Sequence, residues 1–325
     1  MPKPPSDVLW QRKDIMLVAA GSGPCLRELY YRAVEQGKLQ QLMFCHTIDD
    51  DYTMGTAEEK ITRVIKRAAA VHGVQVVVLY LNCLDILTRL DFDYLESSLS
   101  EATGIMVRYF FRGPLGKMDI RHFKPVYEFM AELPEENGCI SHNLYQLPPL
   151  ATDVAGVIDT LPANEAKVLV APSGCRACLR DGDLLEQTQG VYTLETKKQD
   201  FIYGIEDNCV KQCRELMSDG KYKSLNLISS AVAAFIGFDG NWVANSMENN
   251  LKTRSFNIDG FNDAVYGVSC AQELLVEEEQ ELYVKPAREI LILGYSPLLC
   301  GEREQYAECF AYIRSMGYEP RFVGE

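Results

Sequence analysis

The chain is 325 residues long, which is too long for one ordinary domain and enough for two or three, each able to bury its own core. Its 46 acidic against 32 basic residues give a formal net charge of −14, and no basic patch stands out, so nucleic acid is excluded as a partner. No apolar run approaches the roughly 20 residues that cross a bilayer, and the N-terminus lacks the features of a secretory signal. We therefore expect a cytoplasmic protein with no membrane partner.

Cysteine is the unusual part of the composition. Eleven cysteines are about twice the usual share for this length, whereas histidine occurs only 4 times. In the cytoplasm these cysteines are expected as thiols, and their excess indicates metal or redox chemistry rather than a disulfide framework. A metal site would depend on thiolate ligands, which favours zinc or an iron–sulfur cluster.

The first third of the chain alternates between strand and helix patterns. An apolar strand at 15–20 leads into a small-residue turn that ends at Cys25. Thr56 and Glu59 form a capping box, and the helix that follows is expected to bury one face, formed by Ile61, Val64, Ile65 and Ala68. The near-continuous apolar run at 74–81 is typical of a parallel strand covered on both faces. A further helix and a strand at 105–110 close the unit.

The same pattern then occurs a second time. The turn ending at Cys25 is matched by a turn ending at Cys175, 150 positions later. The apolar strand at 74–81 is matched by 224–231, again 150 positions later, and two further features correspond at offsets of 149 and 148. An offset that stays within 148–150 predicts a duplicated β-α-β-α-β unit. Right-handed crossovers then give each copy a doubly wound, Rossmann-like parallel sheet, so the fold class is α/β with tandem units.

We expect three parts along the chain. The first repeat takes residues 1–134 and the second takes 135–285, with a stretch rich in Pro and Gly at 133–167 between the two patterns. Residues 286–325 have the order strand, loop, helix and strand, and Gly317 is a suitable C-cap for the helix. This last part is interpreted as the start of a third, truncated α/β unit.

Small-residue turns, cysteines and acidic residues follow one order in both copies. In the second copy the order is Gly138-Cys139, Ala171-Pro172-Ser173-Gly174-Cys175, Asp200 to Gly204, and Ser229-Ser230-Ala231. In the first copy it is Gly23-Pro24-Cys25, Asp51 to Gly55, and Leu81-Asn82-Cys83 followed by Asp91. By these motifs the chain resembles the nitrogenase component 1 family from about Asp14 to its end. It departs from the family in having two first-domain copies, and Ala231 where the second copy would offer its third cysteine.

The resemblance implies an iron–sulfur cluster held by cysteines. In the family, equivalent first-domain cysteines of two related subunits share a cluster. The matching positions here are Cys25, Cys83, Cys139 and Cys175, with Cys178 as an alternative ligand. Four thiolates are the number that a 4Fe–4S cubane needs, and a fused pair of first domains would recreate the shared interface inside one chain. No catalytic residue follows from the resemblance.

The function that the resemblance implies is that of an oxidoreductase subunit. Such a protein accepts electrons from an ATP-dependent iron-protein reductase, transfers them through its cluster, and reduces a substrate held elsewhere. Its other partner is a homologous nitrogenase-like subunit or a second copy of the chain in a dimer. The alternative within the family is a non-catalytic scaffold that carries a cluster.

The residues themselves leave other interpretations open. Cys175 and Cys178 form a C-x-x-C pair at the start of a predicted helix, which is also the pattern of a thiol–disulfide redox site, and with Cys139 they form a possible zinc ligand set. The acidic run at 49–51 either binds a hard cation or forms a solvated loop, and 108–112 is either a buried strand or an aromatic surface for a partner. Core or surface positions suit the remaining cysteines on predicted helices and strands, which are Cys45, Cys209, Cys213, Cys270 and Cys309.

Overall fold

The computed structural model describes residues 3–88, 90–113, 115–116, 123–141, 146–172, 175, 190–197, 199–247, 251–280 and 288–323. The chain divides into two compact units, unit 1 (Met1–Pro149) and unit 2 (Leu150–Glu325). The division into three parts at 134/135 and 285/286 stays a prediction. Across the described ranges, no helix combines the length and the apolar character needed to cross a bilayer.

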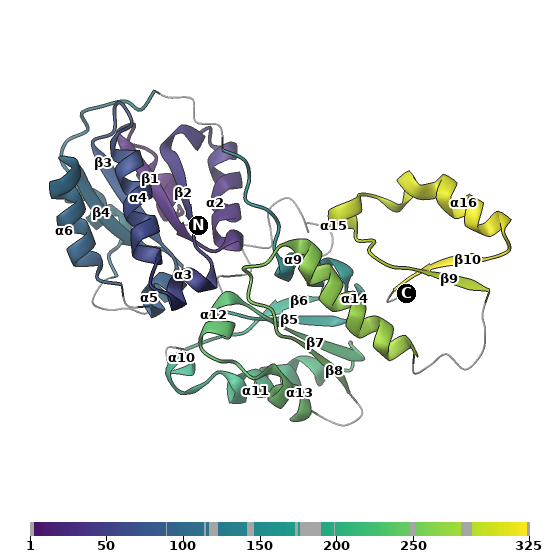
Figure 1. The fold of residues 1–325 in the computed structure, drawn as a ribbon. Coiled ribbons are helices and arrows are strands. Elements are labelled where there is room, and N and C mark those ends of the chain that lie inside the picture. The colour runs from purple at the N-terminus through teal and green to yellow at the C-terminus, as the bar shows by residue number, and fades with distance from the viewer. Residues whose placement is uncertain are drawn as a thin grey trace. The chain divides into compact units, whose positions relative to one another are not determined.

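Unit 1 contains a parallel sheet of four strands in the order β2-β1-β3-β4 (Figure 1). The strands are β1 (Ile15–Gly21), β2 (Leu42–His46), β3 (Val76–Leu81) and β4 (Met106–Phe111). The helices are α1 (Pro5–Leu9), α2 (Gly23–Glu35), α3 (Asp49–Thr53), α4 (Ala57–Ala69), α5 (Cys83–Leu87), α6 (Phe92–Thr103) and α8 (Val126–Ala131), with a short 3-10 helix η1 (Leu39–Gln41).

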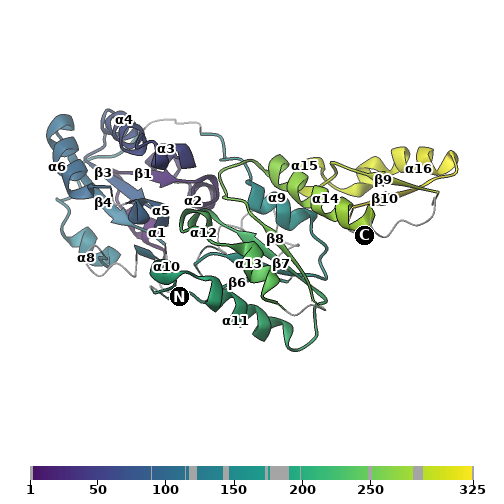
Figure 2. The same cartoon turned by 60° about the horizontal axis from the view of Figure 1, so that its bottom comes forward.

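Helices cover both faces of this sheet (Figure 2). Along β1, Met16 and Val18 pack in a core with residues of α4 and α6, whereas Leu17 packs in the opposite core with residues of α1, α2 and α8. All seven residues of β1 are buried, as expected for a central parallel strand that alternates between two covered faces.

Unit 2 begins with a parallel sheet of the same design, in the order β6-β5-β7-β8. Its strands are β5 (Ala166–Val170), β6 (Val191–Thr193), β7 (Ser224–Ser229) and β8 (Lys252–Phe256). Its helices are α9 (Asp153–Thr160), α10 (Asp200–Tyr203), α11 (Glu206–Met217), α12 (Ala231–Phe235), α13 (Gly240–Asn245) and α14 (Ala264–Gln280).

The last part of unit 2 contains a parallel pair of strands, β9 (Glu289–Ile292) and β10 (Glu319–Phe322). Between them lie α15 (Pro297–Cys300), the 3-10 helix η3 (Arg303–Tyr306) and α16 (Ala307–Ser315) (Figure 1). The predicted order of strand, loop, helix and strand is therefore confirmed.

The predicted duplication is confirmed by the register of the strands. In unit 1, Leu17 of β1 lies opposite Val78 of β3, and in unit 2 Lys167 of β5 lies opposite Asn226 of β7. Lys167 stands 150 positions after Leu17, and Asn226 stands 148 positions after Val78, so both offsets lie within the range of 148–150 found in the sequence. The helices that flank the sheets repeat as well, because α1 contacts α8 and α9 contacts α14. Both copies are thus the doubly wound parallel-sheet units that the α/β prediction required.

The start of α4 corrects one local prediction. Thr56 is the N-cap residue, but its side chain makes no capping hydrogen bond, and the Thr56 hydroxyl donates to Asp51 Oδ1 at 2.8 Å. Asp51 lies in α3 with 3% of its surface exposed, and it also accepts from Lys60 Nζ at 2.6 Å. The interpretation of 49–51 as a solvated loop is therefore wrong for Asp51, because a buried carboxylate needs these donors.

The α9–α14 pair approaches more closely than side chains would allow. A Cβ atom on Gly156 of α9 would lie 2.2 Å from the carbonyl oxygen of Ala264, and one on Gly267 of α14 would lie 2.0 Å from the carbonyl oxygen of Asp153. Glycine is therefore required on both helices at this crossing. Neither α1 nor α8 contains a glycine, so the corresponding pair in unit 1 does not depend on this contact.

Candidate functional site

The strand order of unit 1 creates a switch point between β1 and β3. The chain leaves β1 toward β2 on one side and returns to β3 on the other, so the loops after β1 and β3 diverge at the carboxyl edge of the sheet. Open α/β sheets place ligands in the crevice at this position. We call the residues gathered there, Cys25, Asn82, Cys83, Asp85 and Arg112, the thiol edge.

The two thiols of this edge lie at the N-terminal ends of two helices. Cys25 is the third residue of α2, which starts directly after β1, and Cys83 is the first residue of α5, which starts directly after β3. Cys25 is half-buried and Cys83 is 7% exposed. Burial raises the pKa of Cys83 to about 12, and the neighbouring Cys25 adds to this rise while Arg112 opposes it. Because the pKa of Cys83 is raised, a bound cation would be needed to deprotonate this thiol at neutral pH.

Asn82 holds the two strand ends together. Its Nδ2 donates to the carbonyl oxygen of Ala20 at 3.1 Å, which ties the end of β3 to the end of β1. Its Oδ1 accepts from the backbone N–H of Leu84 at 2.7 Å and so caps α5. Gly21 makes room for this side chain: its φ is +141°, and a Cβ there would lie 1.8 Å from Asn82 Nδ2.

Asp85 forms the base of the site in a buried network. It accepts from the backbone N–H of Asn82 at 2.8 Å and from the Tyr52 hydroxyl at 3.0 Å, and Tyr52 in turn lies 2.8 Å from the Thr47 hydroxyl. Burial raises the pKa of Asp85 to about 6, against the stabilising effect of these donors. The network orients α5 and therefore the position of Cys83.

Arg112 brings a positive charge to the thiol edge. It follows β4, its Nη1 donates to the carbonyl oxygen of Cys25 at 3.0 Å, and its guanidinium lies 5.2 Å from the centre of the Tyr80 ring. The next residue, Gly113, has a φ of +85°, and a Cβ there would approach Cys83 Sγ to 3.1 Å. The edge thus combines two thiols with a cation that opposes the rise in the pKa of Cys83.

The carboxyl edge of unit 2 has a helix cap equivalent to Asn82 but no thiol at the position of Cys83. Ser230 Oγ donates to the carbonyl oxygen of Val170 at 2.7 Å and accepts from the backbone N–H of Ala233 at 3.3 Å, which are the two roles of Asn82. Ala231 then stands at the position of Cys83. Cys175 is half-buried after the end of β5, in the place that corresponds to Cys25.

The predicted ligand set is only partly brought together. Cys25 and Cys83 share one edge of unit 1, but Cys139 lies at the opposite, amino edge: Ile140 donates to the carbonyl oxygen of Lys13, just before β1. β1 has seven residues, which at about 3.3 Å per residue separate the two edges by roughly 20 Å. Cys175 belongs to unit 2, and Cys178 lies outside the described residues. Within the described part of the chain, no three His, Cys, Asp or Glu side chains form a cluster suited to a metal ion.

Asn82, Asp85 and Arg112 had no predicted role in a site, although Asn82 stands in the motif 81–83 and Arg112 ends the stretch 108–112. Asn82 and Asp85 have the spacing of a capping box directly after a buried strand, so this signal was present. Arg112 had no such signal, because its position depends on the packing of β4 beside β3.

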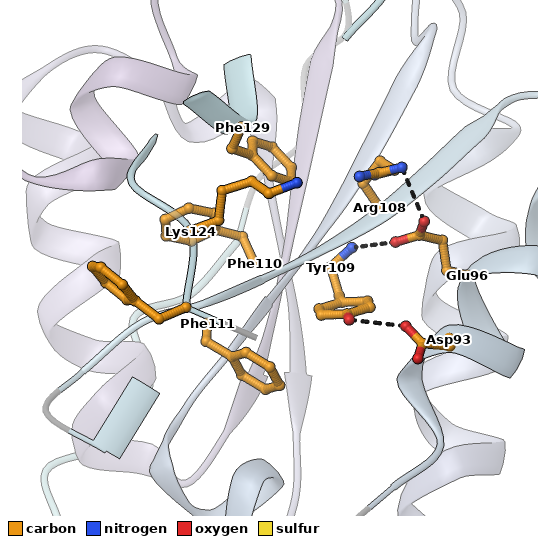
Figure 3. Close-up of a pocket in the computed structure, with 9 residues that line it drawn as sticks. Asp93, Glu96, Arg108, Tyr109, Phe110, Phe111, Lys124 and Phe129 are labelled. Atoms are coloured by element: carbon orange, nitrogen blue, oxygen red, sulfur yellow. Dashed lines mark hydrogen bonds and ion pairs between the residues drawn. The ribbon is translucent and has the colours of Figure 1, made fainter. Parts of the chain in front are cut away.

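A second hollow lies beside β4, with a cavity volume of about 190 Å³ (Figure 3). Glu96 accepts from the backbone N–H of Tyr109 at 3.3 Å and pairs with Arg108 at 3.2 Å, and Tyr109 donates to Asp93 at 2.9 Å. Lys124 pairs with Glu132 at 2.6 Å. Each of these charged groups already has a partner in unit 1. We therefore interpret them as groups that cover the edge strand β4 and not as a ligand site. The stretch 108–112 therefore contains the end of strand β4, as one of the two interpretations predicted.

No protein-family model matches the chain, and no curated protein matches it in sequence. A solved chain of nitrogenase Cp1 at pH 5 is similar over 57% of this chain and 42% of its own length, with 15% identity and a TM-score of 0.42. A chain of nitrogenase Cp1 at pH 6.5 gives 57% and 40% coverage, 16% identity and a TM-score of 0.43. The chain thus spans less than half the length of these two structures, and a likeness at this level assigns no activity.

Proposed function

We propose that the chain is an iron–sulfur redox subunit of the nitrogenase component 1 type, which receives electrons from an ATP-dependent iron-protein reductase and delivers them to a substrate. The observation that carries the proposal is the meeting of Cys25 and Cys83 at the ends of two neighbouring parallel strands, beside the Arg112 guanidinium. Thiolates are the ligands that iron–sulfur clusters use, and a switch point is where such a sheet binds a ligand.

The residues present fit half of the ligand set of a 4Fe–4S cluster. Cys25 and Cys83 supply two of the four thiolates, and Cys139 lies at the wrong edge to join them. In our proposal a second copy of the chain brings its own pair, so that two equal edges complete one cluster. Cys175 of unit 2 is the other source of a ligand, and the amount of iron per chain separates the two arrangements.

The surrounding residues hold the thiols for this role. Asn82 and Asp85 fix the start of α5, Gly113 leaves space in front of Cys83, and Arg112 offsets part of the negative charge that thiolates bring. Burial of Cys83 keeps water away from that side of the site. A bound cluster would supply one-electron transfer, whose potential depends on charge and solvent exposure of this kind.

The test is the iron and acid-labile sulfide content of the full chain purified without oxygen. We expect about two iron atoms per chain if two copies share a cubane, and about four per chain if unit 2 completes it. The variants Cys25→Ser and Cys83→Ser should each lose the iron. Cys309→Ser changes an exposed cysteine of α16 and should keep it. Iron-free protein, or iron that persists in both edge variants, would overturn the proposal.

A non-catalytic scaffold is the second candidate. The observation that favours it is the asymmetry of the two units, since Ala231 replaces a thiol at the position of Cys83. The two functions separate in one assay, in which the cluster-loaded protein is mixed with an iron-protein reductase and ATP and followed by electron paramagnetic resonance. ATP-dependent reduction of the cluster supports the redox subunit, and a cluster that stays oxidised supports the scaffold.

A further inference from the structure

Unit 2 contains a cavity of about 380 Å³ away from its carboxyl edge. One wall is formed by the C-terminal end of α9, the loop before β5 and Lys167 of β5. The other wall is formed by the segments that follow β9 and β10, including Tyr295, Arg303 and Val323. This second wall lies at the carboxyl ends of the parallel strands β9 and β10, which is a common ligand position, and the volume is within the range of small-molecule pockets.

The two walls are held together by hydrogen bonds of buried groups. Gln272 of α14 donates to the carbonyl oxygen of Tyr295 at 2.8 Å and accepts from the backbone N–H of Gly294 at 2.7 Å. Asp159 of α9 accepts from the Ser296 hydroxyl and from the backbone N–H of Leu298. Ser296 is 1% exposed, so this junction is closed to water. The cavity is therefore a built feature of unit 2.

Lys167 is a charged residue at a buried position of the strand β5. It is 1% exposed, in the middle of a strand, and it occupies the register position of Leu17, a core residue of unit 1. Its Nζ donates to the carbonyl oxygen of Pro162 at 2.6 Å, whereas an ammonium group has three hydrogens to donate. The nearby Glu165 carboxylate is already bound by Arg254 and Asn226. A buried cation with one neutral acceptor among the described residues is costly, so an anionic ligand would complete its coordination.

The remaining lining indicates what kind of anion fits. Arg303 enters from the opposite wall, with its guanidinium 4.0 Å from the centre of the Phe322 ring and 5.6 Å from that of Tyr295. Asp159, the one carboxylate among the described lining residues, already accepts two hydrogen bonds. Most of the other lining side chains are apolar, among them Leu161, Pro162, Ala163, Ile292 and Val323. Two basic groups and an apolar wall suit one anionic group attached to an apolar body.

We infer that this cavity is a binding site for a small organic carboxylate, whose carboxylate group accepts hydrogen bonds from Lys167 and Arg303 and whose apolar body packs beside Ile292 and Phe322. The site is independent of the thiol edge, which lies in unit 1.

The experiment compares three probes on the full chain by isothermal titration calorimetry. Benzoate carries both the carboxylate and the apolar body, inorganic phosphate carries only the charge, and benzyl alcohol carries only the apolar body. We expect benzoate to bind more tightly than either of the other two, with a dissociation constant below about 1 mM.

Two variants and a control locate the binding. Lys167→Leu restores the residue of the other repeat, so it is expected to fold, and it should weaken benzoate binding by about tenfold or more through the loss of a charge-assisted hydrogen bond. Arg303→Gln changes an exposed residue outside the core and should also weaken binding. Lys211→Leu removes an exposed lysine of α11 and should leave it unchanged.

Benzoate that binds Lys167→Leu and Arg303→Gln as tightly as the native chain would overturn the inference, as would native protein that binds none of the probes. Equal binding of benzoate and benzyl alcohol would also contradict it, because the cavity would then be a plain apolar pocket.

Discussion

The two repeats share their strand order and register but differ at the positions where chemistry is possible. At the carboxyl edge, unit 1 has Asn82 and Cys83 where unit 2 has Ser230 and Ala231. On the sheet face covered by α9 and α14, unit 2 has Lys167 where unit 1 has the core residue Leu17. The same backbone thus accommodates a thiol pair in one copy and a buried lysine in the other. It can do so because the backbone hydrogen bonds between the strands do not depend on these side chains.

At the strand ends, the residues that differ between the two units differ in pairs of neighbours. Gly21 and the longer Asn82 occur together in unit 1, whereas Ala171 and the shorter Ser230 occur together in unit 2. Both Asn82 and Ser230 donate to the end of the neighbouring parallel strand, β1 or β5, and cap the following helix. The volume lost at one position is therefore gained at its neighbour, which keeps the geometry of the strand ends.

Gly21→Ala is expected to have the largest effect. The new Cβ would overlap Asn82 Nδ2 at 1.8 Å, and the residue would have to keep a φ of +141°. Together these effects should lower the free energy of unfolding by about 3 to 5 kcal/mol, measured by urea denaturation.

The double variant Gly21→Ala with Asn82→Ser sharpens this test, since it installs the pair of unit 2 in unit 1. It should recover about 1 to 3 kcal/mol relative to the sum of the two single changes. A Gly21→Ala protein as stable as the native chain would show that the strand ends are not packed as described.

Gly267→Ala should come next in size, because it acts on the glycine contact that distinguishes α9–α14 from α1–α8. The added methyl group would lie 2.0 Å from the Asp153 carbonyl oxygen, and separation of the helices should cost about 2 to 4 kcal/mol of stability in thermal or urea unfolding. Val265→Ala, at an exposed position of the same helix, is the control and should change stability by less than about 1 kcal/mol. Equal effects of the two changes would contradict the close crossing.

Lys167→Leu places the residue of unit 1 in unit 2 and, unlike the two glycine variants, should stabilise the protein. Burial lowers the pKa of Lys167 from 10.5 to about 8, an effect that Glu165 partly opposes; Asp159, Tyr295 and Arg303 also face the cavity. Between pH 8 and 10.5 the unfolded chain keeps a proton that the folded protein has released, so the free energy of unfolding rises with pH in this window. Below pH 8 the penalty is fully present, and the variant should be more stable by about 2 to 3 kcal/mol at pH 7.

The measurement is the stability difference between Lys167→Leu and the native chain across this pH range. The difference should shrink as the pH rises from 8 toward 10.5, because the folded lysine is then neutral and the cost of removing its proton falls until the unfolded chain releases its own proton as well. A difference that does not vary with pH would mean that Lys167 is solvated.

The smallest effects are expected at a feature that the two copies share, the aspartate that caps a helix. Asp91 caps α6 by accepting from the backbone N–H of Tyr94 at 3.0 Å, and Asp239 caps α13 by accepting from that of Trp242 at 2.9 Å. Asp91→Ala and Asp239→Ala should each lower stability by about 1 kcal/mol in urea unfolding, and the two values should agree within about 0.5 kcal/mol. Clearly unequal values would show that the two caps have diverged as the strand ends have.

Much of the fold could be predicted from the sequence, and only half of the candidate site. The apolar strands, the helix face of Ile61 and Ile65, and the constant offset of the repeat are local patterns, and the structure confirms them. Cys25 and Cys83 each follow a buried strand, and two central parallel strands necessarily end at the same edge. Cys139 was grouped with them through the family resemblance, but the segment that contains it runs past the start of β1.

What the amino-acid sequence determined by itself is the duplicated parallel architecture, because hydrophobic period and turn chemistry act between residues that are near in the chain. The tertiary structure alone decided that Arg112 lies beside Cys25 and that Lys167 is enclosed in a cavity. Both depend on contacts between distant segments, and Lys167 is buried only because α9, α14 and the segment after β9 close over one face of β5. A charged residue in an apolar strand is ambiguous in sequence, since its free energy is set by the groups that surround it after folding.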